Sequence, residues 1–314
     1  MDELLRYKQK LTHLRVNRSK GQSAPHKPLL LLSIIQEIEI GNIRQNKIYI
    51  TAELVARFKN NFFLLSNAQS FTPNFSLPFY HLNSEGFWHF KYQVGRQLQL
   101  TTSLSITGLK QLQDVIDFAY FDNELFLLLL QNESRSILKD CISETYFNGK
   151  IDKKTLGNNY YEEVEEILLN EPAIVYKKEV LTLDEEEIFI RKGAFKKIVP
   201  QIYNQSCCIS GMRIISSFQI QMVDACHIVP FSESHDDTIT NGISLCPNLH
   251  RAFDRGLIAI DNNYKLIVSE KFSEECINYS IAMYANKKLM LPLESKYYPA
   301  INNLEWHRKH IFKN

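Results

Sequence analysis

The chain has 314 residues, which is long enough for two domains that each bury a core of their own. Its hydrophobic content of 45% and charged content of 23% are typical of a globular protein, and no apolar run is long enough to span a membrane. The first residues lack the pattern of a signal peptide, and the six cysteines are too irregularly spaced for a secreted disulfide framework. We therefore expect a cytoplasmic protein with no membrane partner.

The formal net charge of +1 conceals an uneven distribution of charge along the chain. Residues 1–64 carry eleven lysines or arginines against five acidic residues, whereas residues 122–187 carry sixteen acidic residues against seven basic ones. The positive excess in the first segment is compatible with a basic face that binds a polyanion. Solvated helix faces would give the same composition, so charge alone leaves both interpretations open.

The first part of the chain, up to about residue 165, predicts a mixture of helices and strands. Residues 25–42 (PHKPLLLLSIIQEIEIGN) have prolines at the start, a glycine near the end and apolar residues at helical spacing between them, which predicts a buried helix. Similar patterns predict a strand at 46–51, a helix at 52–65, a hairpin at 79–92 that turns at Ser84–Gly86, and helices at 123–131 and 160–170.

The second part begins after a stretch near Pro172 that has no regular hydrophobic pattern. We therefore place a linker at 166–185 and a second domain at 186–314. The patterns predict, in chain order, a helix at 186–204 that Pro200 interrupts, a strand at 218–228, a loop at 230–242, a helix at 249–256 closed by Gly256, and a hairpin at 257–269. This order places His227 at the end of a strand and His250 near the start of a helix.

Residues 224–256 (DACHIVPFSESHDDTITNGISLCPNLHRAFDRG) contain three histidines and two cysteines. His227, Asn241 and His250 follow one another at intervals of 14 and 9 residues. With CCISG before it and FDRGLIAI after it, this pattern resembles the HNH endonucleases of bacterial restriction systems, whose core is a ββα-metal unit. The resemblance covers about residues 186–270. It implies an α+β protein in which a mixed α/β DNA-binding domain, residues 1–165, precedes a C-terminal ββα-metal HNH nuclease domain.

Hydrolysis of a phosphodiester requires a deprotonated water, a cation at the non-bridging oxygens and stabilisation of the leaving 3′ oxygen. A neutral His227 can take the proton from water, because histidine titrates near neutral pH, and the matching histidine of the family has that role. Asn241 matches the residue that orients this histidine or ties the loop to the metal end of the site. His250 matches a metal ligand. The resemblance therefore implies a divalent cation, Mg²⁺ or Mn²⁺, and no other cofactor.

The helix after the motif offers further candidates. Asp254 follows His250 by four residues, or one helical turn, so both side chains can reach one cation. Arg251 and Arg255 flank that face and can contact the scissile or a neighbouring phosphate.

One position departs from the family pattern. Many relatives carry an acidic or histidine ligand immediately before the catalytic histidine, where this chain has Cys226. A thiolate is a poor ligand for Mg²⁺, so either Asp224 or water completes the metal shell. We expect the other potential metal ligands to have ordinary roles. His235 is expected to be an exposed loop residue. Cys207, Cys208 and Cys246 are expected to be buried thiols, because no complete CxxC pair is present.

The N-terminal part has a resemblance of its own. APHKPLLLL and LPFYHLNSEGFW are similar to the sulfur-binding domain of phosphorothioate-dependent restriction endonucleases, which precedes an HNH domain in one chain. The resemblance implies double-stranded, modified DNA as the partner. A site for a phosphorothioate should combine an apolar cup for the sulfur with a donor or cation for the remaining oxygen. We expect Leu77, Pro78 and the Cβ face of His81 to form the cup.

The phosphate is expected to contact His26 and Lys27 at the start of a helix, with Arg18 and Lys20 adding to the basic surface. An arginine often stands where this chain has Lys27, and lysine lacks the bidentate guanidinium, so a different modification such as methylated cytosine is the alternative. Other classes considered are a DNA-binding protein without catalysis and an RNA-cleaving toxin. The sequence does not decide whether one site cuts each strand in turn or a homodimer spans the duplex.

Overall fold

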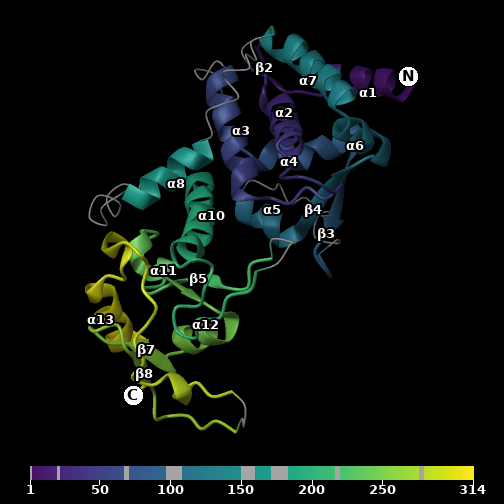
Figure 1. Ribbon diagram of the computed structural model, residues 1–314. Helices are drawn as coiled ribbons and strands as arrows, with labels where there is room; N and C mark the ends of the chain where they lie inside the picture. Colours follow the sequence, from purple (N-terminus) through teal and green to yellow (C-terminus); the bar gives the residue numbers. More distant parts are fainter. Residues whose placement is uncertain are drawn as a thin grey trace. The chain divides into compact units, whose positions relative to one another are not determined.

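The computed structural model describes residues 2–19, 22–66, 71–96, 108–149, 160–170, 183–215, 220–275 and 279–314 (Figure 1). The chain divides into two compact units. The first comprises Met1–Glu162 with Glu185–Ile190, and the second comprises Glu163–Asp184 with Arg191–Asn314. No helix in the described part of the chain is both long and apolar enough to cross a bilayer.

The first unit is a helical assembly around one central helix, α2 (His26–Glu39). Figure 1 shows α2 among the other helices, and it contacts α3, α4, α6 and α7. The elements of this unit are α1 (Asp2–Thr12), β1 (Arg18–Ser19), β2 (Gln22–Ser23), α3 (Ala52–Leu65), α4 (Ser76–His81), η1 (Leu82–Glu85), β3 (Trp88–Tyr92), α5 (Leu109–Val115), β4 (Ile116–Phe121), α6 (Asn123–Leu130) and α7 (Asn132–Phe147).

The helix predicted at 25–42 is confirmed, and its burial explains its sequence. Side chains are buried on all sides of α2 from Lys27 to Ile38, as expected for a helix that is apolar around most of its circumference. The predicted helices at 52–65 and 123–131 are also confirmed as α3 and α6. Thr51 caps α3, because its side-chain oxygen accepts a hydrogen bond from the backbone N–H of Leu54.

The predicted hairpin at 79–92 is wrong. Its first half forms α4 and η1, and β3 pairs instead with the distant β4, with Trp88 opposite Phe121. Pro78 lies within the first turn of α4, where proline is tolerated because the N–H that it lacks would have no partner in the helix. The strand predicted at 46–51 is reduced to one bridge between Ile48 and Ala119.

The second unit contains a strand–strand–helix motif. Its elements are α8 (Tyr160–Asn170), α10 (Glu185–Ile202, shared with the first unit), β5 (Asp224–His227), α11 (Phe231–Ser234), η4 (Ile239–Asn241), β6 (Gly242–Leu245), α12 (Pro247–Asp254), β7 (Ile258–Ile260), β8 (Leu266–Val268), η5 (Ala282–Tyr284), η6 (Ser295–Tyr297) and α13 (Ile301–His310). β5 and β6 are antiparallel, with His227 opposite Gly242, and α12 follows β6 directly and contacts both strands.

The predicted order of strand, loop and helix is confirmed in this unit, as is the hairpin at 257–269, which is formed by β7 and β8. Pro200 does not end α10, which continues to Ile202. Helix α8 extends to Asn170, so the first residues assigned to the linker are helical, and 171–182 lie outside the described residues. Together the two units confirm an α+β protein with a ββα motif in its C-terminal part.

Candidate active site

His227, the last residue of β5, has two close partners. Its Nε2 lies 2.7 Å from Oδ1 of Asp237, whose side chain is fully buried, whereas 22% of the His227 side chain is exposed. Its ring stacks on Phe195 of α10 with centroids 4.1 Å apart and an angle of 9° between the planes. These contacts fix the position and the tilt of the imidazole while leaving part of it accessible to solvent.

The hydrogen bond to Asp237 also fixes the tautomer. A carboxylate only accepts hydrogen bonds, so the proton is on Nε2 and the lone pair is on Nδ1. Nδ1 is then the atom of His227 that can accept a proton from water. When it does so, the buried carboxylate of Asp237 stabilises the imidazolium that forms.

Asn241 is buried and binds the backbone on both sides of the loop that follows His227. Its Nδ2 donates to the carbonyl oxygens of Val229 (3.0 Å) and Asp236 (2.9 Å), and its Oδ1 accepts from the N–H of Val229 at 2.9 Å. Its own carbonyl oxygen accepts from the N–H of Ile228. These contacts tie η4 to the residues immediately after His227, so Asn241 positions the histidine through the backbone of the loop.

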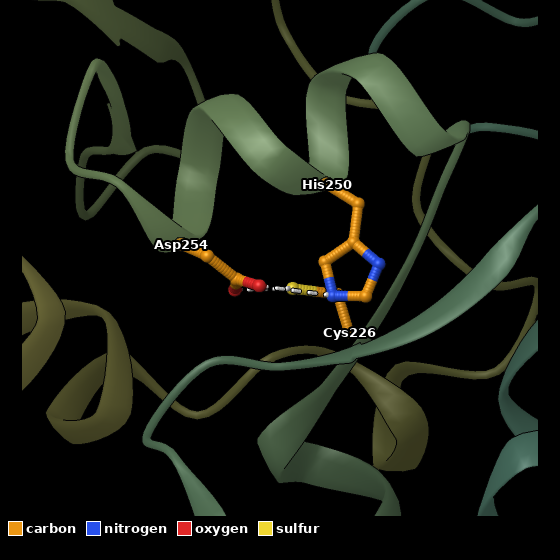
Figure 2. A group of neighbouring side chains, drawn as sticks. All are labelled: Cys226, His250 and Asp254. Carbon is orange, nitrogen blue, oxygen red and sulfur yellow. Dashed lines mark hydrogen bonds and ion pairs between the residues drawn. The ribbon is translucent and has the colours of Figure 1, made fainter. Parts of the chain in front are cut away.

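Figure 2 shows a second cluster, in which Cys226 of β5 points toward His250 and Asp254 of α12. The three potential ligand atoms lie within 4.8 Å of one another. Nε2 of His250 is 3.4 Å from Oδ2 of Asp254, and Sγ of Cys226 is 3.7 Å from Oδ1 of the same carboxylate. One sulfur, one nitrogen and one oxygen donor therefore converge, which is a donor set that suits a divalent transition metal.

Asp224 lies on the other side of the same imidazole. Its Oδ2 is 3.2 Å from Nδ1 of His250, which leaves Nε2 directed at Cys226 and Asp254. This is the arrangement in which a carboxylate orients a metal-binding histidine. Asp224 is therefore placed to orient His250, and the three side chains whose potential ligand atoms converge are Cys226, His250 and Asp254.

Burial raises the pKa of the Cys226 thiol well above its usual value, and the neighbouring Asp254 carboxylate adds to the effect. The free thiol is therefore protonated, and a metal bound to its sulfur would have to displace that proton.

His307 is a core residue: it stacks on Phe253 of α12 with centroids 3.7 Å apart, and burial lowers its pKa to about 4.

The other cysteines are buried, as expected. Cys207, Cys208 and Cys246 have buried side chains, and none of them belongs to a group of three or more potential metal ligands among the described residues. A hydrogen bond from the Cys246 thiol lowers the pKa of Cys207 to about 5. His235 is exposed, in agreement with its expected loop position.

In the first unit, the residues expected to bind phosphate have different surroundings. His26 is about half-buried between Phe62 and Phe71, its Nε2 lies 2.9 Å from the carbonyl oxygen of Thr72, and burial lowers its pKa. Because its pKa lies below the ordinary value, His26 is neutral at pH 7. Arg18 lies in β1, and Lys20 lies outside the described residues.

Lys27 is buried and paired. Its Nζ forms an ion pair with the Glu85 carboxylate and donates a hydrogen bond to Oγ of Ser84 at 3.2 Å. The expected phosphate-binding cation is thus already neutralised by an internal carboxylate in this structure.

Of the residues expected to form the apolar cup, two face solvent. Leu77 and His81 are exposed and lie four residues apart on α4, on one helical face, whereas Pro78 is buried on another. Partial burial lowers the pKa of His81, and the nearby Lys27 adds to the effect. The exposed part of this expected cup therefore consists of Leu77 and the His81 imidazole, with the Pro78 ring buried.

Comparison with known families decides what these two units are. The HNH endonuclease family matches residues 207–261, which include β5, β6 and α12. The second unit carries an HNH endonuclease domain. The family described as ScoMcrA-like, DNA sulfur-binding domain matches residues 5–159. Both predicted resemblances are therefore confirmed, and the sulfur-binding domain precedes the HNH domain in the chain.

A solved structure shows a partial likeness to this chain. A solved structure titled "Modification dependent TagI restriction endonuclease" is 22% identical over 38% of this chain and 38% of that chain, with a TM-score of 0.28. This likeness covers little more than a third of either protein and is too low to support an argument about fold or function. No curated protein matches the sequence.

The HNH domain contains partners that the sequence did not identify. Asp237 was one of two adjacent aspartates in a polar loop, and spacing along the chain does not indicate which of them faces His227. Phe195 lies in a helix 32 positions before His227, so only the tertiary fold brings the rings together. Arg251 is exposed on α12, and Arg255 is exposed immediately after its last residue.

We predict that Asp237→Asn will lower the rate of DNA cleavage by about 10²–10⁴-fold, because an amide can bind the other tautomer of His227 and does not stabilise the imidazolium. The measurement is the single-turnover cleavage rate at saturating enzyme. Glu233→Gln removes an exposed carboxylate from the same loop and should leave the rate unchanged. A rate for Asp237→Asn within twofold of the wild type would contradict the role assigned to this contact.

Proposed function

We propose that this protein is a restriction-type DNA endonuclease that recognises phosphorothioate-modified duplexes with its first unit and hydrolyses phosphodiesters with its HNH domain. The observation that carries the proposal is the presence, in one chain, of a sulfur-binding domain and of an HNH domain with its polar residues assembled. His227 with Asp237 offers a base, and Cys226 with His250 and Asp254 offers a cation site.

In the proposed reaction, Nδ1 of His227 takes a proton from a water molecule, which then attacks the phosphorus. Asp237 stabilises the resulting imidazolium, and Phe195 keeps the ring in place. Arg251 and Arg255 are placed to contact neighbouring phosphates. A divalent cation, when bound, supplies positive charge for the non-bridging oxygens and the leaving 3′ oxygen.

The residues that would hold this cation are Cys226, His250 and Asp254, with Asp224 orienting His250. Mg²⁺ prefers oxygen ligands and accepts sulfur poorly, whereas Mn²⁺, Co²⁺ and Zn²⁺ accept nitrogen and sulfur donors more readily. We therefore propose that the site selects a transition metal over Mg²⁺, which narrows the two cations expected from the sequence to Mn²⁺.

Recognition of the modified linkage is proposed to involve α4 and the start of α2. Sulfur in place of a phosphate oxygen makes that edge of the linkage larger, more polarisable and less well hydrated, so an apolar contact favours it. Leu77 and the neutral His81 offer such a contact. Lys27 and the free N–H groups in the first turn of α2 offer donors for the remaining oxygen.

We predict that the full-length protein binds a duplex with one Rp phosphorothioate at least about tenfold more tightly than the matched unmodified duplex, a difference of about 1.4 kcal/mol. Binding is measured by fluorescence anisotropy in a His227→Ala background, which prevents cleavage. A duplex with methylated cytosine is the third probe. Equal affinity for all sequence-matched duplexes would refute modification-dependent recognition, and preference for the methylated duplex would establish the alternative specificity.

We predict that Cys226→Ser will abolish the near-ultraviolet charge-transfer absorption of the Co²⁺-loaded protein, because only a thiolate ligand produces it, and will weaken Co²⁺ binding by about tenfold or more. Absorption spectroscopy and a metal titration give both readouts without any activity assay. Cys246→Ser, which changes a buried thiol outside the cluster, should retain the absorption. The same band in Cys226→Ser and wild type would rule out sulfur ligation.

A further inference from the structure

Glu85, the last residue of η1, is bound as an anion within the first unit. Its carboxylate forms the ion pair with Lys27, and its two oxygens lie 3.2 and 3.4 Å from the backbone N–H of Arg15. Oγ of Ser84 is 3.5 Å away and also accepts a hydrogen bond from Lys27. Only 6% of the Glu85 side chain and 10% of the Lys27 side chain are exposed.

These partners are the ones that bind a phosphate in proteins: an ammonium, a hydroxyl and a backbone N–H. The site also opens onto a basic depression. A cavity of about 480 Å³ borders Glu85 and is lined by Gln9, Lys10, His13, Arg15, Ser84 and Glu85. The Arg15 side chain is exposed, and no ion pair is formed by it within the described residues. The lining of the cavity therefore includes two cationic groups, Lys10 and Arg15, and the carboxylate of Glu85, and Lys10 also lies 4.0 Å from Asp122.

We propose that Glu85 occupies, in the unbound protein, the position that a backbone phosphate of DNA takes in the complex. On binding, the phosphate replaces the carboxylate at Lys27, and Glu85 moves into the adjoining cavity. This inference rests on the proposed function in one respect, namely that DNA is the ligand of the first unit. It assigns to Glu85 a role in setting the affinity for DNA that neither the motif nor the family match assigns.

The energetic consequence follows from charge. A carboxylate and a phosphate at one ammonium repel each other, so every DNA molecule must break the Lys27–Glu85 pair before it can use Lys27. The cost is the same for all linkages. Lys27 lies near His81 of the proposed sulfur contact, as its effect on the pKa of that histidine indicates. A linkage that also gains an apolar contact at Leu77 and His81 offsets the cost, and an unmodified linkage does not. Glu85 thus lowers the affinity for every linkage by the same factor, so the absolute affinity for unmodified DNA stays low.

The test is DNA binding by the full-length protein in the His227→Ala background, with and without Glu85→Gln. The amide still accepts from Arg15 but no longer competes for Lys27. We expect the Kd to fall by about tenfold for unmodified and phosphorothioate duplexes alike, which corresponds to about 1.4 kcal/mol.

Two matched variants separate this role from simpler ones. Glu133→Gln removes an exposed carboxylate from α7 and should change the affinity by less than about twofold, because salt screens a distant surface charge. In the double variant Lys27→Gln/Glu85→Gln, the gain should disappear, because it depends on Lys27. Unchanged affinity of Glu85→Gln, or an equal gain in the double variant, would overturn the proposal.

Stability and sulfur specificity are tested separately. Thermal unfolding shows whether Glu85→Gln retains the fold. Glu85→Asp, which keeps the charge but shortens the side chain, should give a smaller gain in DNA affinity. If no folded Glu85 variant gains affinity, the proposal is overturned. A tenfold gain in a protein that does not distinguish modified from unmodified DNA would support the role of Glu85 and refute the sulfur specificity. Preference for the phosphorothioate duplex without any gain in affinity from Glu85→Gln would support the sulfur specificity and refute the role of Glu85.

Discussion

The nuclease site depends on the register of β5 against β6. Successive side chains of a strand point to opposite faces, so a slip of one residue would exchange the surroundings of Cys226 and His227. In the observed register, Cys226 reaches Asp254 of α12, while His227 stacks on Phe195 of α10. The Asn241 amide fixes this register where β5 ends, because it binds the backbone on both sides of the intervening loop.

Carboxylates position the important polar groups in both units, with different consequences. In the function that we propose, Asp237 at His227 and Asp224 at His250 orient rings that act while they remain paired. In the same proposal, Glu85 at Lys27 neutralises a group that must be released before it can act on DNA. The difference lies in the proposed roles. His227 as a base and His250 as a metal ligand keep the carboxylates that orient them. A phosphate at Lys27 would instead compete directly with the carboxylate of Glu85.

The sequence predicted those parts of the fold and site that local pattern determines. Helices α2 and α3 have apolar residues at helical spacing, and the motif of His227, Asn241 and His250 located the ββα unit. Aromatic residues at 79–92 did not indicate their partners, because a strand of a hairpin and the buried face of a short helix can share one composition. The contact between Lys27 and Glu85 spans 58 positions, and the one between Cys226 and Asp254 spans 28, so no local pattern contains them. The poor affinity of thiolates for Mg²⁺ argued against Cys226 as a metal ligand. Only the structure shows that its sulfur lies beside His250 and Asp254.

The most direct test of the whole account is the rate at which the protein cuts phosphorothioate-modified and unmodified plasmid in Mn²⁺, measured for the wild type and for His227→Ala. The account predicts that the wild type cuts the modified plasmid preferentially, and that His227→Ala reduces this rate by about 10²–10⁴-fold while its DNA binding is retained. Cleavage by His227→Ala at nearly the wild-type rate, or equal cleavage of both plasmids by the wild type, would contradict it.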